Sequence, residues 1–301
     1  MIKKCKQLEF EFAKDYDDPI QNKDCIEYLK DLPNNSVDLV LTDPPYSIGY
    51  QGEKWDKQWP NELSYLGWCQ EWTELCAKKL KPNRMMVIWG TLKTKVFMKY
   101  DLKVLEKISG FYCQNEIIWG YNWGGRQKIN FARKHEYTWC YSKGKEFLFN
   151  ADDIRVDRKI KSDMNKSKKL LQEYKDKYKE EHDGKEPSKK EIAKHKKEKI
   201  EPQITLKKGT IPTCVWSKNN HTTAKDYCGW HPTTKNIFLL ERIIKAYTNP
   251  GDTVLDIFMG SGSTMIACNN TGRLGIGCEF DEEYYKKSLE RIKELDKARV
   301  M

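Results

Sequence analysis

Residues 253–264 read TVLDIFMGSGST, a short apolar run that passes through two glycines into a helical pattern. The run predicts a buried strand, and residues 263–270 predict a helix, so the glycines fall where a strand turns into a helix. At the carboxyl edge of an open α/β sheet, glycines in this position let the backbone approach a ligand closely. We therefore expect an α/β sheet that binds a ligand at this loop.

The sequence on either side of this loop alternates between strand and helix patterns. Strands are expected at 37–41, 84–89, 116–119, 137–141 and 274–278. Helices are expected at 24–32, 63–80, 91–109, 236–247 and 281–298. Such alternation predicts a mostly parallel sheet with helices on both of its faces.

The composition excludes several classes of protein. The chain has 301 residues, of which 39% are hydrophobic, enough for one large α/β domain with an insertion. No apolar run approaches the roughly 20 residues that span a bilayer, and the N-terminal stretch lacks the apolar segment of a secretory signal. The ten cysteines include no C-x-x-C pair. We therefore expect reduced thiols in the cytoplasm, no metal site and no contact with a membrane.

A lysine-rich segment interrupts the alternation of strands and helices. Residues 155–200 contain 17 Lys or Arg and 10 Asp or Glu, a surplus of seven in a chain whose net charge is +10. Gly184 and Pro187 divide this segment into two predicted helices. Such a segment attracts phosphate backbones by counterion release, or it is a solvated helical hairpin that only keeps the chain soluble. We expect three regions, 1–150, 151–228 and 229–301, of which the middle one is inserted.

The glycine loop favours a nucleoside over a dinucleotide. The third glycine of the dinucleotide fingerprint would fall at Met265, so a pyrophosphate-binding turn is poorly supported. Glu279 lies 19 residues after Gly260, at the end of the next predicted strand. An acidic residue there can accept hydrogen bonds from both hydroxyls of a ribose. The alternative is a tight turn that binds nothing.

The sequence Asp43-Pro44-Pro45-Tyr46 follows the predicted strand at 37–41. Two consecutive prolines fix the backbone and remove two N–H donors, which leaves the Pro44 carbonyl free to accept a hydrogen bond. With the Asp43 carboxylate and the ring of Tyr46, this corner suits a planar ligand that carries an –NH₂ group, such as a nucleobase. Accepting both amine hydrogens would localise the nitrogen lone pair. An ordinary turn remains the alternative.

Together these motifs resemble those of the S-adenosylmethionine-dependent amino-methyltransferases of DNA from restriction–modification systems. The order of the motifs is similar to that of the circularly permuted β class, in which Asp-Pro-Pro-Tyr precedes the cofactor loop. Further matches in the expected order are residues 22–25, 133–136, 231–235 and 277–281. The resemblance covers residues 20–150 and 230–295. Thr234 stands where the family usually has Gln and Asn236 where it usually has Pro, so the roles of that segment are less secure.

The resemblance implies a Rossmann-like, doubly wound and mostly parallel sheet of about seven strands, with a helical lysine-rich insertion in the target-recognition region. It implies S-adenosyl-L-methionine as cofactor. The catalytic residues would be Asp43, Pro44, Pro45 and Tyr46. The cofactor-binding residues would be Asp24, Cys25, Asp43, His231, Thr233, Thr234, Lys235, Asp256, Phe258, Gly260, Ser261, Gly262, Ser263, Thr264, Glu279 and Phe280, although core packing explains Cys25 better. Arg126, Lys128, Arg133 and Lys134 are candidate nucleic-acid contacts.

The implied substrate is double-stranded DNA from which the target base is flipped out of the helix. Within the family, Asp at the first catalytic position accompanies adenine more often than cytosine, so the 6-amino group of adenine is the expected target. The same chemistry on cytosine or RNA, or an inactive nucleic-acid-binding subunit, are the alternatives. A cognate restriction endonuclease and a homodimer are conceivable partners, in the cytoplasm of a bacterium or a phage-infected cell.

Overall fold

The computed structural model describes residues 18–49, 53–90, 110–121, 129, 131–132, 134–156, 161–200, 210–217 and 227–300. The chain divides into two compact units, residues 1–150 with 214–301, and residues 151–213. The helix expected at 91–109 lies outside the described residues, as do three candidate nucleic-acid contacts, Arg126, Lys128 and Arg133.

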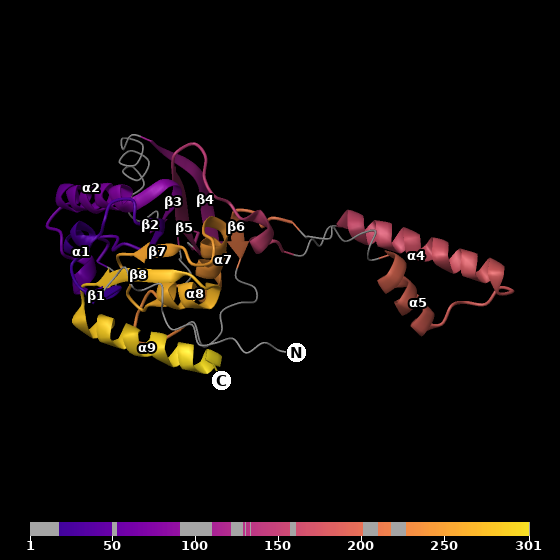
Figure 1. The fold of residues 1–301 in the computed structure, drawn as a ribbon. Coiled ribbons are helices and arrows are strands. Elements are labelled where there is room, and N and C mark those ends of the chain that lie inside the picture. Colours follow the sequence, from indigo (N-terminus) through magenta and orange to yellow (C-terminus); the bar gives the residue numbers. More distant parts are fainter. Residues whose placement is uncertain are drawn as a thin grey trace. The chain divides into compact units, whose positions relative to one another are not determined.

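The first unit is built on one large sheet (Figure 1). The described strands are β1 (Ile20–Asn22), β2 (Val37–Thr42), β3 (Leu80–Gly90), β4 (Phe111–Gly120), β5 (His135–Lys143), β6 (Val215–Ser217), β7 (Thr253–Asp256) and β8 (Leu274–Glu279). Their order in the sheet is β1-β8-β7-β2-β3-β5-β4-β6, and only β5 runs antiparallel to its neighbours among these strands. The mostly parallel sheet is as expected. It has eight strands rather than about seven because the three-residue strands β1 and β6 extend its two edges.

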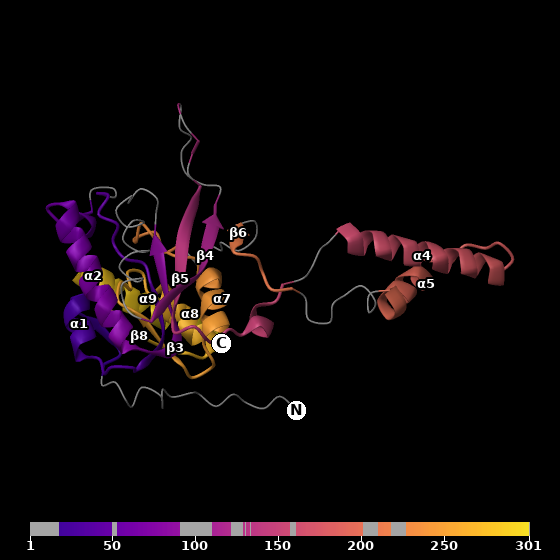
Figure 2. The ribbon, with the colours of Figure 1, turned by 90° about the horizontal axis from the view of Figure 1, so that it is seen from above.

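Helices cover both faces of this sheet (Figure 2). They are α1 (Cys25–Asp31), α2 (Glu62–Lys79), α7 (Ile237–Tyr247), α8 (Ser263–Thr271) and α9 (Glu282–Val300), with the short 3-10 helix η3 (Lys54–Asp56) between β2 and α2. The short 3-10 helix η4 (Ala151–Ile154) belongs to the second unit. Helix α1 packs on α2, whereas α8 packs on both α7 and α9, so the helices form two layers. Across the described ranges, no helix combines the length and the apolar character that crossing a bilayer requires.

The strand order brings the separate motifs to one edge of the sheet. Strands β7 and β8 lie between β1 and β2, and all four are parallel. Val40 pairs with Leu255, Asp256 with Gly277, and Asn22 with Glu279. Because the carboxyl ends of parallel strands meet at the same edge, the residues that follow β1, β2 and β7 lie beside the end of β8.

The central strand β2 is buried along its whole length, as its apolar run predicts. Its one charged residue, Asp38, is 2% exposed and lies between Lys81 Nζ at 2.9 Å and Arg84 Nη2 at 3.0 Å. Burial of a carboxylate is tolerated because these two cations compensate its charge. The nine cysteines within the described ranges are all free thiols, consistent with the expected reduced state.

The glycine loop needs its glycines for two reasons. Gly260 and Gly262 have φ values of +50° and +75°, in the left-handed region that side chains with a Cβ rarely adopt. In addition, a Cβ on Gly260 would lie 2.7 Å from His231 Nε2. A side chain there would therefore strain the backbone and push His231 out of place.

The second unit contains the lysine-rich helices α4 (Lys161–Glu181) and α5 (Lys189–His195), with the helical turn η5 (Lys196–Ile200) after them. Ser188 caps α5 through a reciprocal capping box with Glu191. The two helices contact each other through Tyr178, whose hydroxyl donates to Glu191 Oε1 at 2.9 Å, and through Tyr174, whose ring stacks on His195. The break falls at Gly184, where φ is +81°, as the sequence predicts.

Candidate active site

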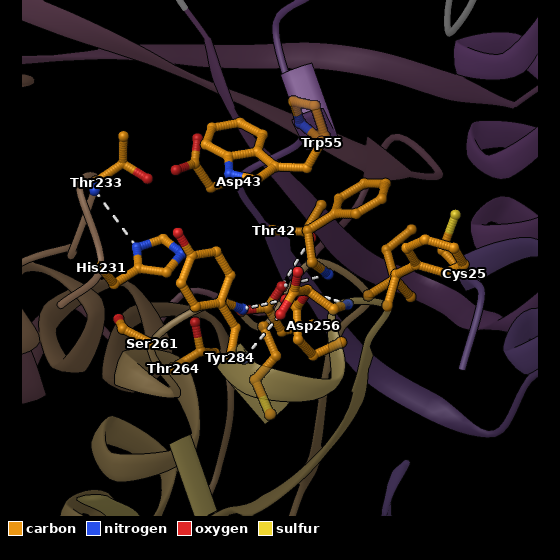
Figure 3. Close-up of a pocket in the computed structure, with 18 of the residues that line it drawn as sticks. Cys25, Thr42, Asp43, Trp55, His231, Thr233, Asp256, Ser261, Thr264 and Tyr284 are labelled. Atoms are coloured by element: carbon orange, nitrogen blue, oxygen red, sulfur yellow. Dashed lines mark hydrogen bonds between the residues drawn. The ribbon is translucent and has the colours of Figure 1, made fainter. Parts of the chain in front are cut away.

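A cavity of about 370 Å³ opens at the carboxyl ends of β2, β7 and β8. Thr42 and Asp256 lie side by side near its centre, with Cys25 to one side and His231 to the other (Figure 3). The sequence-predicted residues that line it are Asp24, Cys25, Asp43, Pro45, His231, Thr233, Lys235, Asp256, Phe258, Gly260, Ser261, Ser263, Thr264, Glu279 and Phe280. The glycine loop and the Asp-Pro-Pro-Tyr corner therefore face one space.

Four other predicted residues are described but do not line this cavity: Pro44, Tyr46, Thr234 and Gly262. Thr234 Oγ1 donates to the His231 carbonyl at 3.1 Å, and Gly262 caps the start of α8. Of the candidate nucleic-acid contacts only Lys134 is described, and its carbonyl accepts a hydrogen bond from the Tyr121 amide at 2.9 Å.

Asp256 ends β7 and is 4% exposed. Its Oδ1 accepts hydrogen bonds from Thr42 Oγ1 at 2.8 Å and from the Phe258 amide at 3.1 Å. Burial raises the pKa of this carboxyl to about 6 despite these bonds. Within the described residues it forms no ion pair.

Glu279 ends β8 and faces the glycine loop. Its Oε2 accepts from the Gly260 amide at 2.8 Å and its Oε1 from the Asp281 amide at 2.9 Å. Burial raises the pKa of Glu279 to about 7, and it too lacks an ion pair among the described residues. The cavity thus holds two carboxylates, the buried Asp256 and the partly buried Glu279, that no described cation pairs with.

Asp24 follows β1, and the pairing of β1 with β8 places it near Glu279. Its Oδ1 caps α1 by accepting from the Ile26 amide at 2.8 Å and the Glu27 amide at 3.3 Å. The neighbouring Cys25 is 4% exposed and packs in the hydrophobic core as well as lining the cavity, so both interpretations of this cysteine describe its position.

His231 is a neutral donor on the wall of the cavity. Burial and, to a smaller extent, the charge of Lys235 lower the pKa of its imidazole to about 4. Its Nδ1 accepts from the Thr233 amide at 3.4 Å. In the neutral ring Nε2 must then carry the hydrogen, and this atom faces the glycine loop.

The Asp43 carboxylate is held at both oxygens. The Tyr46 hydroxyl donates to Oδ1, and Lys235 Nζ forms an ion pair with Oδ2. Burial and the charge of Asp43 raise the pKa of Tyr46, so its phenol stays protonated and donates. The sequence predicted Tyr46 as a stacking ring and Lys235 as a cofactor contact, but it predicted neither of these bonds to Asp43.

Asp56, which the sequence analysis missed, fixes the backbone of the Asp-Pro-Pro-Tyr corner. It is 1% exposed, and its two oxygens accept from the amides of Tyr46 at 2.8 Å, Ser47 at 2.7 Å and Ile48 at 2.9 Å. These bonds hold Ser47 at a φ of +52°, a conformation that a serine adopts only under constraint. The Tyr65 hydroxyl donates to the Pro45 carbonyl at 2.8 Å, which leaves that carbonyl occupied.

Aromatic residues that sequence reasoning also missed complete the walls. Trp55, Trp68, Trp89 and Tyr284 line the cavity, and the ring of Trp68 packs 5.4 Å from that of Phe258. One signal was available, since residues 55–72 contain four tryptophans. Four tryptophans so close together in a highly charged chain indicate an unusual apolar surface.

Comparison with known proteins identifies this arrangement. The sequence profile of the DNA methylase family matches residues 37–290. The type II methyltransferase M.HpaI of Haemophilus parainfluenzae is 30% identical over 268 residues, 89% of this chain and 71% of the relative. The DNA adenine methyltransferase YhdJ of Escherichia coli K12 is 30% identical over 271 residues, 89% of this chain and 80% of the relative.

A solved structure agrees with these relatives. The crystal structure of the M1.HpyAVI–SAM complex is similar with a TM-score of 0.54 and 26% identity, covering 91% of this chain and 98% of that chain. The sheet, the cavity at its carboxyl edge and the matched span therefore lead to one conclusion: the chain belongs to the DNA methylase family and is an S-adenosylmethionine-dependent DNA methyltransferase.

Proposed function

We propose that this chain methylates the 6-amino group of adenine at specific sites in double-stranded DNA. One observation carries the proposal: the Asp43 corner and the glycine loop with Glu279 line the same cavity. A methyl donor and an amine acceptor held there would meet without any further movement of the sheet. Positioning of this kind accounts for a large share of catalysis in group transfer.

The residues on the cofactor side fit S-adenosyl-L-methionine. Asp256 and Glu279 are carboxylates with raised pKa values and no described ion pair, which suits a ligand that brings its own positive charge. Glu279 would accept from the ribose hydroxyls, Asp24 would meet the adenine, and the backbone of 260–262 with His231 would hold the methionine end. When bound, the cofactor supplies an electrophilic methyl group on its sulfonium.

The residues on the other side fit a flipped adenine. Asp43 and the Pro44 carbonyl would accept the two N6 hydrogens and aim the nitrogen lone pair into the cavity. The apolar surface beside Asp43 comes from Pro45 and Trp89, both of which line the cavity. Stacking on an aromatic side chain recovers about 1–3 kcal/mol per base, which offsets part of the cost of flipping. No covalent bond between enzyme and base is needed.

Adenine is favoured over cytosine by two independent considerations. Asp43 stands at the first catalytic position, and the relative YhdJ is named a DNA adenine methyltransferase. We infer that residues 151–228, which include the lysine-rich unit, form the target-recognition region. A cognate restriction endonuclease, a homodimeric assembly and a place in the bacterial cytoplasm near the nucleoid belong to the same proposal.

Isotope transfer tests the substrate directly. The chain is incubated with methyl-labelled S-adenosylmethionine and mixed-sequence duplex DNA, and the DNA is digested to nucleosides and separated. We expect the label in N6-methyladenine. Label only in N4-methylcytosine, or transfer only when RNA replaces DNA, would overturn the adenine assignment, and absence of transfer to any nucleic acid would support the inactive binding subunit. Gel filtration and mapping of methylated sites in an expressing host report the assembly and the recognition sequence.

A further inference from the structure

We propose that Glu136 is a positioning residue for the transfer reaction, which acts through Lys235 to set the charge and orientation of Asp43. The inference rests on the proposed function, because Asp43 is the residue that would hold the target amine. It gives a role to the segment Arg133–Glu136, which matched the family pattern in the sequence and whose described residues, 134–136, contribute no side chain to the cavity lining.

Three side chains from distant parts of the sequence form this network. Asp43 follows β2, Glu136 lies on β5, and Lys235 immediately precedes Asn236, the N-cap of α7. Lys235 Nζ pairs with Asp43 Oδ2 and lies 3.4 Å from Glu136 Oε2. The same ammonium lies 5.3 Å from the centre of the Trp89 ring. Lys235 is therefore fixed from three directions rather than free to reach a cofactor.

One oxygen of Glu136 calls for an explanation. The side chain is 25% exposed, but its Oε2 is inaccessible to solvent and accepts no hydrogen bond from the described residues, so the ion pair with Lys235 is the described polar contact of this oxygen. Desolvation raises the pKa of Glu136 even though Lys235 lowers it. A carboxylate oxygen shielded from water with so little compensation carries a desolvation cost. A role for its charge accounts for its presence.

The charges of the network suit amine methylation. Two carboxylates and one ammonium leave a net charge of −1, beside the phenol of Tyr46, the neutral imidazole of His231 and the carboxyl of Asp256. Burial alone would lower the pKa of Lys235, but Asp43 and Glu136 raise it, so the ammonium is retained.

With the cofactor supplying the methyl group, positive charge would develop on the amine nitrogen as the N–C bond forms and the S–C bond breaks, and the surplus N6 proton would then pass to water. A net negative corner stabilises that charge. By sharing Lys235, Glu136 prevents Asp43 from being fully neutralised as an acceptor.

A double-mutant cycle over the two partners tests the proposal through the pH dependence of kcat. Glu136→Gln keeps the shape but removes one of the two negative charges that share Lys235, so the acid limb of kcat moves to lower pH. Lys235→Met leaves two facing carboxylates, so the acid limb moves to higher pH and kcat falls about 100-fold. The double variant restores the net charge of −1 and should recover about tenfold of that loss. The KM for S-adenosylmethionine should change less than about threefold in all three variants.

A merely structural role for Glu136 predicts something else. It predicts lower activity with an unchanged pH profile, and no recovery in the double variant. Either result would overturn the proposal, as would a rise of the cofactor KM in Lys235→Met that matches the fall in kcat/KM, because Lys235 would then be a cofactor contact.

A second measurement does not depend on catalysis. The wild type, the two single variants and the double variant are denatured chemically without cofactor between pH 5.5 and 8.5. Their stabilities show how the charges of the network affect folding. In Lys235→Met the carboxyl pair has a raised pKa in the folded state, so stability is lost as the pH rises through that value. We expect its unfolding constant to rise about tenfold more over this range than that of the wild type, and the excess to disappear in the double variant. Absence of this excess would refute the network, whereas absence of methyl transfer by the wild type would refute only the proposed function.

Discussion

The two sides of the cavity differ in how far the charges of their acidic residues are compensated by the protein. On the cofactor side, Asp256 and Glu279 have raised pKa values and no described cation beside them. On the catalytic side, Asp43 is paired with Lys235, and Asp56 accepts three backbone amides. The carboxylates on the cofactor side therefore lack a compensating partner in the protein. Those on the catalytic side are largely compensated by Lys235 and by backbone amides.

This difference indicates what each side binds. A carboxylate that burial makes reluctant to ionise gains most from a positively charged ligand, and the sulfonium cofactor is one. A carboxylate already paired and oriented suits a neutral ligand such as a nucleobase, which brings no charge but must be placed accurately. Each of the following changes affects one side and should leave the other unaltered.

Removing the acceptor on the catalytic side should have the largest effect. Asp43→Ala eliminates the hydrogen-bond acceptor and leaves Lys235 beside Glu136 alone, so we expect methyl transfer to fall by at least about 10³-fold. Calorimetric titration should show cofactor affinity within about threefold of the wild type, because the cofactor side keeps its contacts. The matched change Glu279→Ala should abolish cofactor binding, and methyl transfer is then lost with it. Retained transfer in Asp43→Ala would contradict the assigned role.

Asp56 does not line the cavity, so changing it tests how much the orientation of the Asp-Pro-Pro-Tyr corner matters without removing a contact to the cofactor or the base. Asp56→Asn places an N–H group against amides that need an acceptor, so the backbone of residues 46–48 loses its fixed shape. We expect kcat to fall about 30-fold and stability to fall by about 2 kcal/mol, since buried amides lose their partners. Steady-state kinetics and chemical denaturation measure the two effects, with exposed Asp153→Asn as the control. Normal kcat in a folded Asp56→Asn protein would show that the corner keeps its shape without this carboxylate.

The pH dependence of cofactor binding should show whether the uncompensated carboxylates Glu279 and Asp256 contribute to binding. Glu279 and Asp256 have pKa values of about 7 and about 6 in the free protein, so each loses its charge as the pH falls below its value. A cationic ligand binds the ionised forms better, and affinity should therefore fall about tenfold between pH 8 and pH 5.5. Stability of the free protein should contain the opposite contribution from these groups, which is lost as the pH rises through 6 and 7. Calorimetric titration across this range checks the binding, and a flat profile would refute the interpretation.

The smallest effect on the cavity should come from the lysine-rich unit. Replacing Lys189, Lys190 and Lys194 of α5 with Gln should weaken binding to duplex DNA about fivefold and reduce its salt dependence. Cofactor affinity should stay unchanged, since the cavity lies wholly within the other unit. The same change at Lys286, Lys287 and Lys293 of α9 controls for net charge. Equal losses in both variants would mean that α5 has no specific part in DNA binding.

The sequence predicted what depends on local pattern. The apolar run of β2, the strand-loop-helix unit around Gly260 and the break at Gly184 each lie within a few consecutive residues, and the structure has all three. The three-residue strands β1 and β6 were missed because so short a segment shows no periodicity.

The contacts that orient the site could not be predicted in the same way. Asp56 meets the amides of residues 46–48 because the chain turns back after the Asp-Pro-Pro-Tyr corner, and a lone acidic residue in a loop shows no pattern. Lys235 meets Asp43 and Glu136 only after three elements have assembled. Resemblance to a family supplied the residues of the cavity, but it did not supply their charge balance.

The position of β7 and β8 between β1 and β2 has a consequence for how the protein folds during translation. A ribosome releases β1 and β2 early, yet the strands that join them begin only at Thr253 and Leu274. Until they are synthesised, the buried apolar strand β2 lacks its neighbour on that side, and sheets closed by such remote pairing fold slowly. The Asp-Pro-Pro-Tyr corner and the glycine loop can therefore come together only after β7 has been synthesised.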